Sequence, residues 1–210
     1  FYTGVAYGVV DNMRLIQGLD FFNDQLVITE KGLLPAEYLL FSRFLMYPSV
    51  YSHHTTRIAQ LMFSRAVESL IESSPSPLDY ALALRVMDDY EIDTTLRNAG
   101  GYPEEMITRI NERRLFKRAL YIQLNMLEEN LMEELREESR VRELEMEISK
   151  RAGVDEKYLI LDVQSDIGAF LKESEAQVAI HNEIRSLSDV SELVKMLNRA
   201  SYDFRRLGIY

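Results

Sequence analysis

Apolar side chains at helical spacing run from residue 36 to residue 71, on both sides of a single proline, Pro48. Ala36–Leu45 is apolar and compatible with a helix, and Ile58–Ile71 carries an apolar stripe at helical period. A helix tolerates proline in its first turn and is disrupted by proline in its interior. The pattern therefore predicts two helices that meet near Pro48, the second spanning Ser49–Ser73, in a mostly α-helical protein.

Chemically active side chains gather where these two helices meet: Tyr47, Tyr51, His53, His54 and Arg57. Positions 47, 51 and 54 share one face of a helix, whereas the adjacent residues His53 and His54 diverge by about 100°. The two histidines are therefore not expected to share a target. Spacing alone shows no catalytic motif. Two interpretations stay open, namely ligand binding, or a tyrosine and a histidine satisfied within the core or at its boundary.

Length and composition are those of an ordinary soluble globular protein. The 210 residues suffice for one substantial core, or for one core with a small appended domain. The chain has no cysteine, which excludes disulfides and thiolate metal sites. No apolar run approaches the ~20 residues that span a bilayer. We expect a cytoplasmic protein with no membrane partner.

The charge distribution combines an acidic background with one basic cluster. The formal net charge of −10 argues against general nucleic-acid binding, which depends on lysine and arginine neutralising phosphates. Against this background, Arg113, Arg114, Lys117 and Arg118 place four positive charges close together. This cluster is either a solvated helix face or a phosphate-binding patch.

Glycine and proline divide the first half of the chain into short elements. We expect a loop at Phe1–Gly8 and a helix at Val9–Leu19 that ends near Gly18. A small hairpin should follow, with a strand at Gln25–Thr29 and a turn at Glu30–Gly32. The next helix should have Pro35 in its first turn. After a break at Ser73–Pro77, helical periodicity continues to Asn98, interrupted or capped at Asp88 and Asp89, and a new helix starts at Tyr102.

The second half changes from helical to mixed patterns. Phe116–Leu124 fits either a strand or a continued helix, and Glu128–Lys150 predicts one or two acidic amphipathic helices. We expect strands at Lys157–Val163, Ala176–His181 and Leu207–Tyr210, with a helix after Ser188–Ser191 and a structural role for His181. The predicted fold is mostly α-helical, with a helical body at residues 1–125, an acidic connecting helix at 126–153 and a small α+β subdomain at 154–210.

Four stretches resemble, in the same order, segments of a known enzyme family. Tyr2–Gly8, followed by Asp11 and Arg14, is similar to the segment after an Asp-Tyr-x-x-Arg-Asp motif. Met46-Tyr47-x-x-Val50-Tyr51-x-His53-His54-x-x-Arg57 is similar to the segment that follows the metal centre. Arg113–Lys117 resembles an Arg-x-Leu-Phe-Lys element, and Ser188–Tyr210 resembles a C-terminal helix with an Arg-x-x-x-Tyr ending. The family is the HD-domain phosphohydrolases of the dNTP triphosphohydrolase type, which includes the sterile-alpha-motif and HD-domain enzymes.

The resemblance implies that the chain is the C-terminal half of such an enzyme. The family binds its metal through a His, a His-Asp pair and a later Asp, whereas the histidines here are His53, His54 and His181 and no His-Asp pair occurs. We therefore expect the upstream HD half of the same protein to hold the divalent metal (Mn, Mg, Fe, Ni or Zn). This chain then contains no metal ligand and no catalytic residue, and is expected to be inactive alone.

Two sets of binding residues follow from the same resemblance. Arg43 matches a position that contacts substrate phosphates, Tyr51 matches a tyrosine that packs on the sugar, and Tyr47 stands where relatives often have a histidine. A regulatory nucleotide that promotes homo-oligomerisation would be bound by Arg14, His53, His54, Arg113 and Lys117. The expected substrate is a nucleotide or another phosphate ester.

A catalytically silent role is the alternative. The chain would then be a helical interaction or oligomerisation module, in which Arg43, Tyr51, Arg113 and Lys117 serve ordinary packing and ion-pair roles. The upstream sequence distinguishes these alternatives, because only an enzyme requires the metal-binding motifs there.

Overall fold

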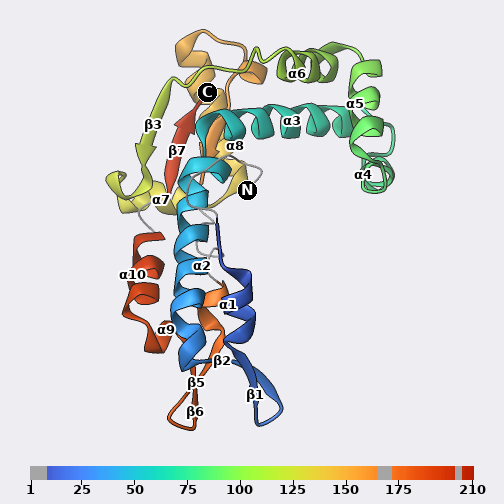
Figure 1. Ribbon diagram of the computed structural model, residues 1–210. Coiled ribbons are helices and arrows are strands. Elements are labelled where there is room, and N and C mark those ends of the chain that lie inside the picture. Colours follow the sequence, from blue (N-terminus) through green and yellow to red (C-terminus); the bar gives the residue numbers. More distant parts are fainter. Residues whose placement is uncertain (1–8, 165–171, 202–204) are drawn as a thin grey trace. The chain divides into compact units, whose positions relative to one another are not determined.

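Figure 1 shows a computed structural model of the chain, which describes residues 9–164, 172–201 and 205–210. Helices dominate, and short strands form two small sheets. The prediction of a mostly helical protein with a small α+β part is confirmed. The loop predicted at Phe1–Gly8 lies outside the described residues.

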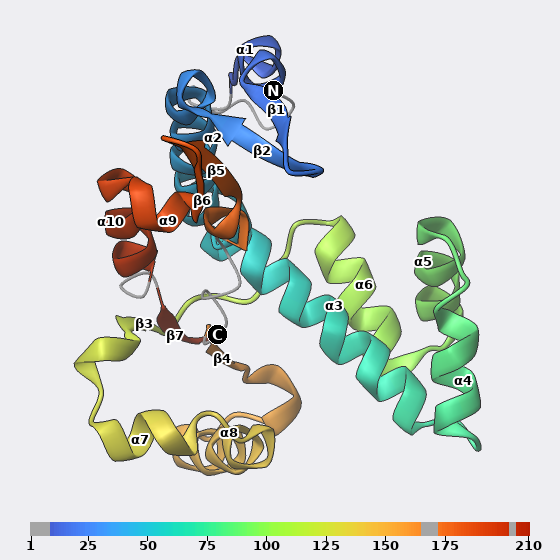
Figure 2. The same cartoon turned by 90° about the horizontal axis from the view of Figure 1, so that it is seen from below.

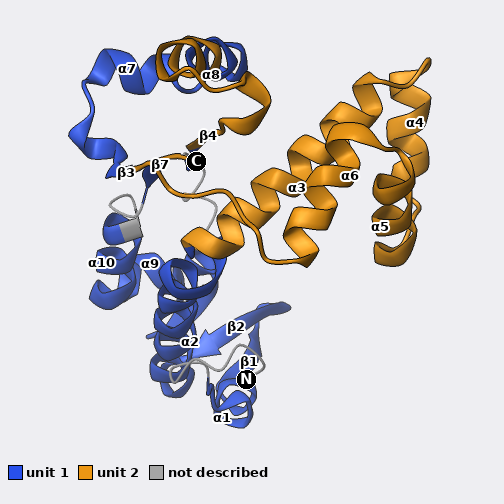
Figure 3. Cartoon of the chain, turned by 90° about the horizontal axis from the view of Figure 1, so that it is seen from above, with its two compact units in different colours: residues 1–53, 121–144, 163–207 blue, residues 54–120, 145–162, 208–210 orange. Residues whose placement is uncertain are grey.

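The chain folds into two compact units, coloured separately in Figure 3. Unit 1 contains residues 1–53, 121–144 and 163–207, and unit 2 contains residues 54–120, 145–162 and 208–210. Each unit therefore combines segments that are distant in sequence. The division predicted from the sequence at residues 125 and 153 stays a prediction.

Unit 1 is built around a four-stranded sheet with the order β1-β2-β5-β6. β1 pairs antiparallel with β2 (Leu19 opposite Ile28), β2 parallel with β5 (Ile28 opposite Val178), and β5 antiparallel with β6 (Val178 opposite Arg185). The bounds are β1 Leu19–Phe22, β2 Gln25–Thr29, β5 Gln177–Ile180 and β6 Glu183–Ser186. The N-terminal hairpin and the C-terminal strands thus form one sheet.

Helix α2 (Leu33–Met46) packs against this sheet and against α10 (Glu192–Ser201), as Figure 2 shows. The core joins one side of α2, two strands and the last helices, through Ile28, Ala36, Leu40, Phe44, Val178, Leu187, Val194 and Leu197. Unit 1 also contains the short helices α1 (Asn12–Gln17), α7 (Glu129–Glu134) and α9 (Leu187–Val190).

Two glycines bring α1 close to the start of α2. A Cβ atom added to Gly18 would lie 2.3 Å from the Cα of Gly32, so neither position leaves room for a side chain. The Gly18 carbonyl accepts hydrogen bonds from the Thr29 amide at 2.8 Å and the Thr29 hydroxyl at 3.0 Å. As the sequence predicted, the first helix ends at Gly18.

The predicted hairpin turn was wrong, and two strands, β1 and β6, were missed. The β1–β2 turn lies at Asn23 and Asp24, whereas Glu30–Gly32 forms a 3₁₀ turn that leads into α2. Asn23 and Asp24 both have positive φ, as do His181 and Asn182 in the turn before β6. Such two-residue turns normally carry glycine, so turns without it give little sequence signal.

Unit 2 is centred on the long helix α3 (His54–Glu72), which lies beside α6 (Gly101–Asn111) in Figure 2. The α3 stripe consists of Ile58, Met62, Ala66 and Leu70, and all four side chains are buried. They pack with Leu96, Met106, Ile107, Phe116, Ile160 and Tyr210. The apolar stripe predicted after Pro48 is therefore the core of this unit.

The remaining helices of unit 2 begin close to the positions that the sequence suggests. α4 (Pro77–Leu84) starts at the last residue of the predicted break, and Asp88 caps α5 (Asp89–Asn98) in a reciprocal capping box with Glu91. Gly100 and Gly101 both have positive φ and separate α5 from α6. The predicted cap at Asp88 is confirmed.

The segment around Pro48 differs from its prediction. Tyr47–Tyr51 forms a π-helical turn, closed by the Ser52 amide donating to the Tyr47 carbonyl at 2.7 Å, and α3 starts at His54 instead of Ser49. The wider turn places Pro48 at its start, where the missing N–H is tolerated. Positions 47, 51 and 54 therefore do not share one face of a continuous α-helix.

A second sheet has the strand order β3-β7-β4, with β3 at Leu120–Gln123, β7 at Arg206–Ile209 and β4 at Leu161–Val163. The stretch left open between strand and helix thus contains a strand. The acidic region forms two helices, α7 and α8 (Glu138–Ala152), in agreement with the sequence.

Candidate functional site

Unit 2 contains a cavity of about 740 Å³ beside the first turn of α3. The cavity is formed by the start of α3, the end of α6 and the segment that follows α6. Its lining residues are His54, Thr55, Ile58, Ala59, Ile110, Arg113, Leu115, Phe116, Lys117 and Arg118. We call this the basic cavity, because three of the four clustered cations line it.

The first turn of α3 contributes His54 and Thr55 to the basic cavity. The first four backbone N–H groups of an α-helix have no partner within the helix, and the helix dipole makes this end positive. α3 starts here because the chain leaves helical geometry between the π-helical turn and His54. This wall of the cavity therefore favours an anion.

The end of α6 positions the cationic side chains. Arg113 has φ +58°, and the Arg114 amide donates to the Arg109 carbonyl at 2.7 Å, which is the Schellman way of ending a helix. The next residues are fixed by Phe116, whose side chain is buried and whose amide donates to the Met62 sulfur at 3.4 Å. Lys117 and Arg118 follow Phe116 directly, and both are exposed.

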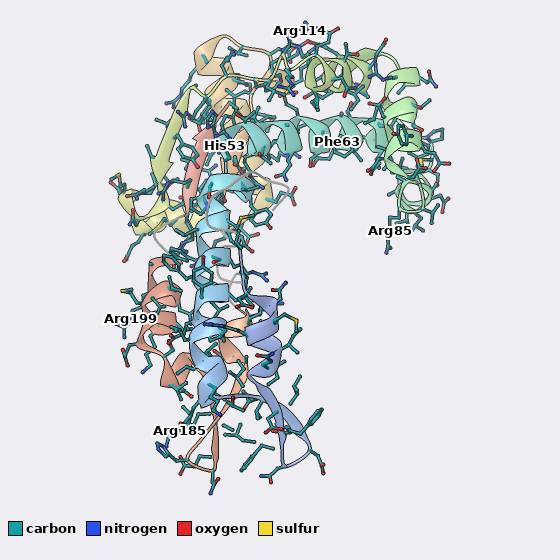
Figure 4. The ribbon with its side chains drawn as sticks, viewed as in Figure 1. His53, Phe63, Arg85, Arg114, Arg185 and Arg199 are labelled. Atoms are coloured by element: carbon teal, nitrogen blue, oxygen red, sulfur yellow. The ribbon has the colours of Figure 1, made fainter. Side chains whose placement is uncertain are left out.

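Two cations of the basic cavity, Arg113 and Lys117, are not neutralised by the described acidic residues close by in sequence. Arg114, labelled in Figure 4, pairs with Glu112 at 2.6 Å. Within the part of the chain that the structure describes, no carboxylate pairs with Arg113 or Lys117. Two cations on one cavity wall therefore remain available to a bound anion.

The ring of Tyr158 packs against Phe116, and the ring of Tyr102 packs against Tyr158. The Arg109 guanidinium lies 5.8 Å from the ring centre of Phe116 and 5.9 Å from that of Tyr158, and pairs with Glu105 at 3.0 Å. The hydroxyl of Tyr158 donates to Glu105 at 2.8 Å, and this hydrogen bond raises the pKa of Tyr158. Burial raises the pKa of Tyr102 to about 12. The phenols of Tyr158 and Tyr102 therefore stay protonated and neutral around physiological pH.

Two ion pairs with buried carboxylates hold α3 in unit 2. Arg57 donates to both oxygens of Asp162, at 2.7 and 2.9 Å, and the Asp162 side chain is 1% exposed. Arg65 pairs with Glu145, which also accepts a hydrogen bond from the Leu161 amide at 2.7 Å. Sequence reasoning placed Arg57 in the polar cluster and missed its partner, because no local pattern relates positions 57 and 162.

The residues predicted to bind substrate lie in unit 1. Arg43, on α2, pairs with Glu173 at 2.6 Å. The rings of Tyr47 and Tyr51 contact edge to face, with centres 5.0 Å apart. Arg43 therefore holds a carboxylate that a phosphate would have to replace.

The predicted regulatory residues divide between the units. His54, Arg113 and Lys117 come together in the basic cavity. Arg14 lines a separate cavity in unit 1 and pairs with Asp11 at 3.4 Å, and His53, labelled in Figure 4, is the last residue of the first segment of unit 1. The structure thus groups three of the five residues.

The described residues contain neither a cluster of metal ligands nor a helix that could span a membrane. Within residues 9–164, 172–201 and 205–210, no three carboxylate or histidine side chains are grouped as metal ligands would be. Over the same ranges, every helix is too short or too polar to cross a bilayer. The metal expected in an upstream half stays a prediction.

Residues 10–210 match the protein family described as the HD associated region. The chain belongs to this family. Curated relatives of this HD-associated region include the uncharacterized proteins MJ1154 of Methanocaldococcus jannaschii, 30% identical over 100% of this chain, and YwfO of Bacillus subtilis, 26% identical over 94%. The chain spans only 46% and 50% of those two proteins.

Solved structures share the fold of this HD-associated region. A phosphohydrolase (BT4208) from Bacteroides thetaiotaomicron has a TM-score of 0.66 and 20% identity, and the match covers 100% of this chain and 57% of that one. A hypothetical protein from Aquifex aeolicus has a TM-score of 0.66 and 24% identity, covering 99% and 49%. In both cases the similarity extends over essentially the whole chain.

Proposed function

We propose that this chain is the phosphate-binding half of a metal-dependent HD-superfamily phosphohydrolase that acts on nucleotides, in the manner of the dNTP triphosphohydrolases. The observation that carries the proposal is the basic cavity, where Arg113 and Lys117 lie with the N-terminal turn of α3. Membership of the HD-associated region and a structural neighbour named phosphohydrolase support the same class.

The basic cavity is suited to a polyphosphate. Guanidinium, ammonium and helix N-terminal amides are the groups that bind phosphate oxygens in proteins. A cavity of about 740 Å³ is large enough for a nucleotide. We assign the regulatory nucleotide to this site, with His54, Arg113 and Lys117 as its contacts. Binding there would promote self-association of a cytoplasmic enzyme.

Substrate contacts are assigned to unit 1. Arg43 would bind substrate phosphate after exchanging its partner Glu173, and the exposed ring of Tyr51 would pack against the sugar. Tyr47 contacts Tyr51 edge to face and would fix the orientation of its ring. A divalent metal held by the preceding half would polarise the phosphate and activate water.

Hydrolysis by a polypeptide that includes the preceding half tests this function. With manganese or magnesium we expect it to release triphosphate or phosphate from deoxynucleoside triphosphates, and the 210-residue chain alone to be inactive. Arg43→Ala should lower turnover at least about tenfold, since charge-assisted phosphate contacts are strong. Arg185→Ala, which removes an exposed arginine that also pairs with a glutamate, is the matched control. No hydrolysis with any divalent metal would instead favour a silent interaction module.

A further inference from the structure

Helices α1 and α2 carry two rows of exposed apolar side chains. Met13 and Leu34 are 65% and 73% exposed. On α2 the apolar residues are spaced by four and then three positions, which places them in a row along one side. On α1, Met13 and Ile16 are spaced by three positions, and Val9 lies just before the helix. The two rows are Val9, Met13 and Ile16, and Leu34, Tyr38 and Phe41. We call these six residues the α1–α2 face.

A cavity of about 590 Å³ in unit 1 lies beside the second row, and Leu34 and Tyr38 of that row line it. Leu34, Pro35 and Tyr38 line it from α2, and the polar residues Asp11, Arg14, Gln17 and Lys31 also line it. An apolar centre with polar groups around it is the usual composition of a protein–protein interface. Large contiguous apolar patches are uncommon on monomeric soluble proteins, and where they occur they mark binding surfaces.

We propose that the α1–α2 face is the docking surface for the metal-binding half of the same polypeptide. This inference rests on the proposed function, which places that half before residue 1. The curated relatives are about twice as long as this chain, so they contain enough additional polypeptide to cover the face.

Covalent attachment favours this partner over a second copy. Under the proposed function the preceding half belongs to the same polypeptide, so it is present at a higher effective concentration than a separate chain. Docking on the first turns of α2 would also fix the helix whose last turn carries Arg43.

The test compares charge insertions on the face with a control elsewhere. The variants are Met13→Glu and Leu34→Glu, and the control is Val86→Glu, an 86% exposed apolar residue in unit 2. The preceding half is produced as a separate polypeptide, and its Kd for each form of the 210-residue chain is measured by calorimetry. Thermal unfolding of each form shows whether the variant is folded.

We expect each face variant to weaken binding at least about tenfold, because burying one leucine or methionine side chain contributes that much to affinity. Val86→Glu should bind like the unsubstituted chain, and all three variants should unfold at an unchanged temperature. Unweakened binding by both face variants, in a mixture that still hydrolyses nucleotides, would overturn the docking surface and leave the proposed function intact.

Two further outcomes separate the two proposals. If the face variants weaken binding between the two halves, but the halves together hydrolyse no nucleotide, the docking surface would be supported and the proposed function contradicted. Self-association of the 210-residue chain that Leu34→Glu abolishes, with no binding to the preceding half, would assign the face to a second copy and overturn the inference.

Discussion

The Arg57 guanidinium binds both carboxylate oxygens of Asp162, at 2.7 and 2.9 Å, and so joins the first turns of α3 to the start of β4. His54 lies three residues before Arg57, on the same side of the helix, and lines the basic cavity. The ion pair therefore fixes the part of α3 that forms one wall of the proposed phosphate site.

Asp162→Ala should destabilise the fold by about 3 kcal/mol, since it leaves a partly buried guanidinium without its bidentate partner. Urea unfolding measures the change. Glu147→Ala removes an exposed pair with Arg151 and should change the free energy of unfolding by less than about 0.5 kcal/mol. Equal effects of the two substitutions would show that the buried pair contributes no more than a surface pair.

Arg113→Gly should separate stability from binding. Arginine at φ +58° costs about 1 kcal/mol relative to glycine, so the variant should be slightly more stable. It also removes a cation from the basic cavity and should weaken tripolyphosphate binding. Arg113→Ala removes the same charge without relieving the backbone, and should weaken binding equally with no gain in stability. Chemical unfolding and calorimetry on both variants test this, and tight binding by Arg113→Gly would rule out the arginine as a contact.

The free energy of unfolding at alkaline pH should depend on Tyr102. Burial raises its pKa to about 12 in the folded protein, against about 10 when unfolded, so the unfolded chain releases its proton first as pH rises. The stabilisation is complete below pH 10 and is lost as pH rises toward 12. Tyr102→Phe should flatten the slope of unfolding free energy in this window by at most about 1.4 kcal/mol per pH unit.

Tyr90→Phe is the control for that slope, because Tyr90 is almost fully exposed. Tyr102→Phe also loses the hydrogen bond from the Tyr102 hydroxyl to the Lys157 carbonyl, which should cost about 1 kcal/mol at neutral pH. A slope that is unchanged by Tyr102→Phe would mean that this phenol titrates normally.

Glu173→Gln should strengthen substrate binding at Arg43. Removing the carboxylate leaves the guanidinium to the phosphate, and because the pair is exposed the gain should be at most about fivefold. Glu183→Gln breaks another exposed pair of unit 1, with Arg185, and should have no effect. The KM for a nucleotide measures both. A gain that persists in the Arg43→Ala background would show that Glu173 acts on some other group.

Local patterns predicted the helical part of the fold well. The α3 stripe, the Asp88 cap and the stops at Gly18 and Gly100–Gly101 depend on spacing, capping chemistry and backbone freedom, which act over a few residues. What the sequence did not predict is non-local. The pairing of β2 with β5 joins residues about 150 positions apart, and no periodicity encodes it.

The site was predictable to a similar extent. Four cations among acidic residues identify the 113–118 segment, and the resemblance to a known family adds His54. Their grouping in one cavity needed the turn at Arg113, a non-glycine residue with positive φ that sequence patterns do not indicate. The partners of Arg43 and Arg57 lie more than a hundred residues away in the chain, beyond the reach of spacing arguments.

The most direct test of the account is calorimetric titration of the 210-residue chain with inorganic tripolyphosphate. We predict that Arg113→Glu combined with Lys117→Glu weakens binding at least about tenfold, since both cations line the basic cavity. Arg85→Glu, which reverses an exposed charge in the same unit away from the cavity (Figure 4), should leave binding unchanged. Equal binding by the double variant and the unsubstituted chain would contradict the assignment of the basic cavity as a phosphate site.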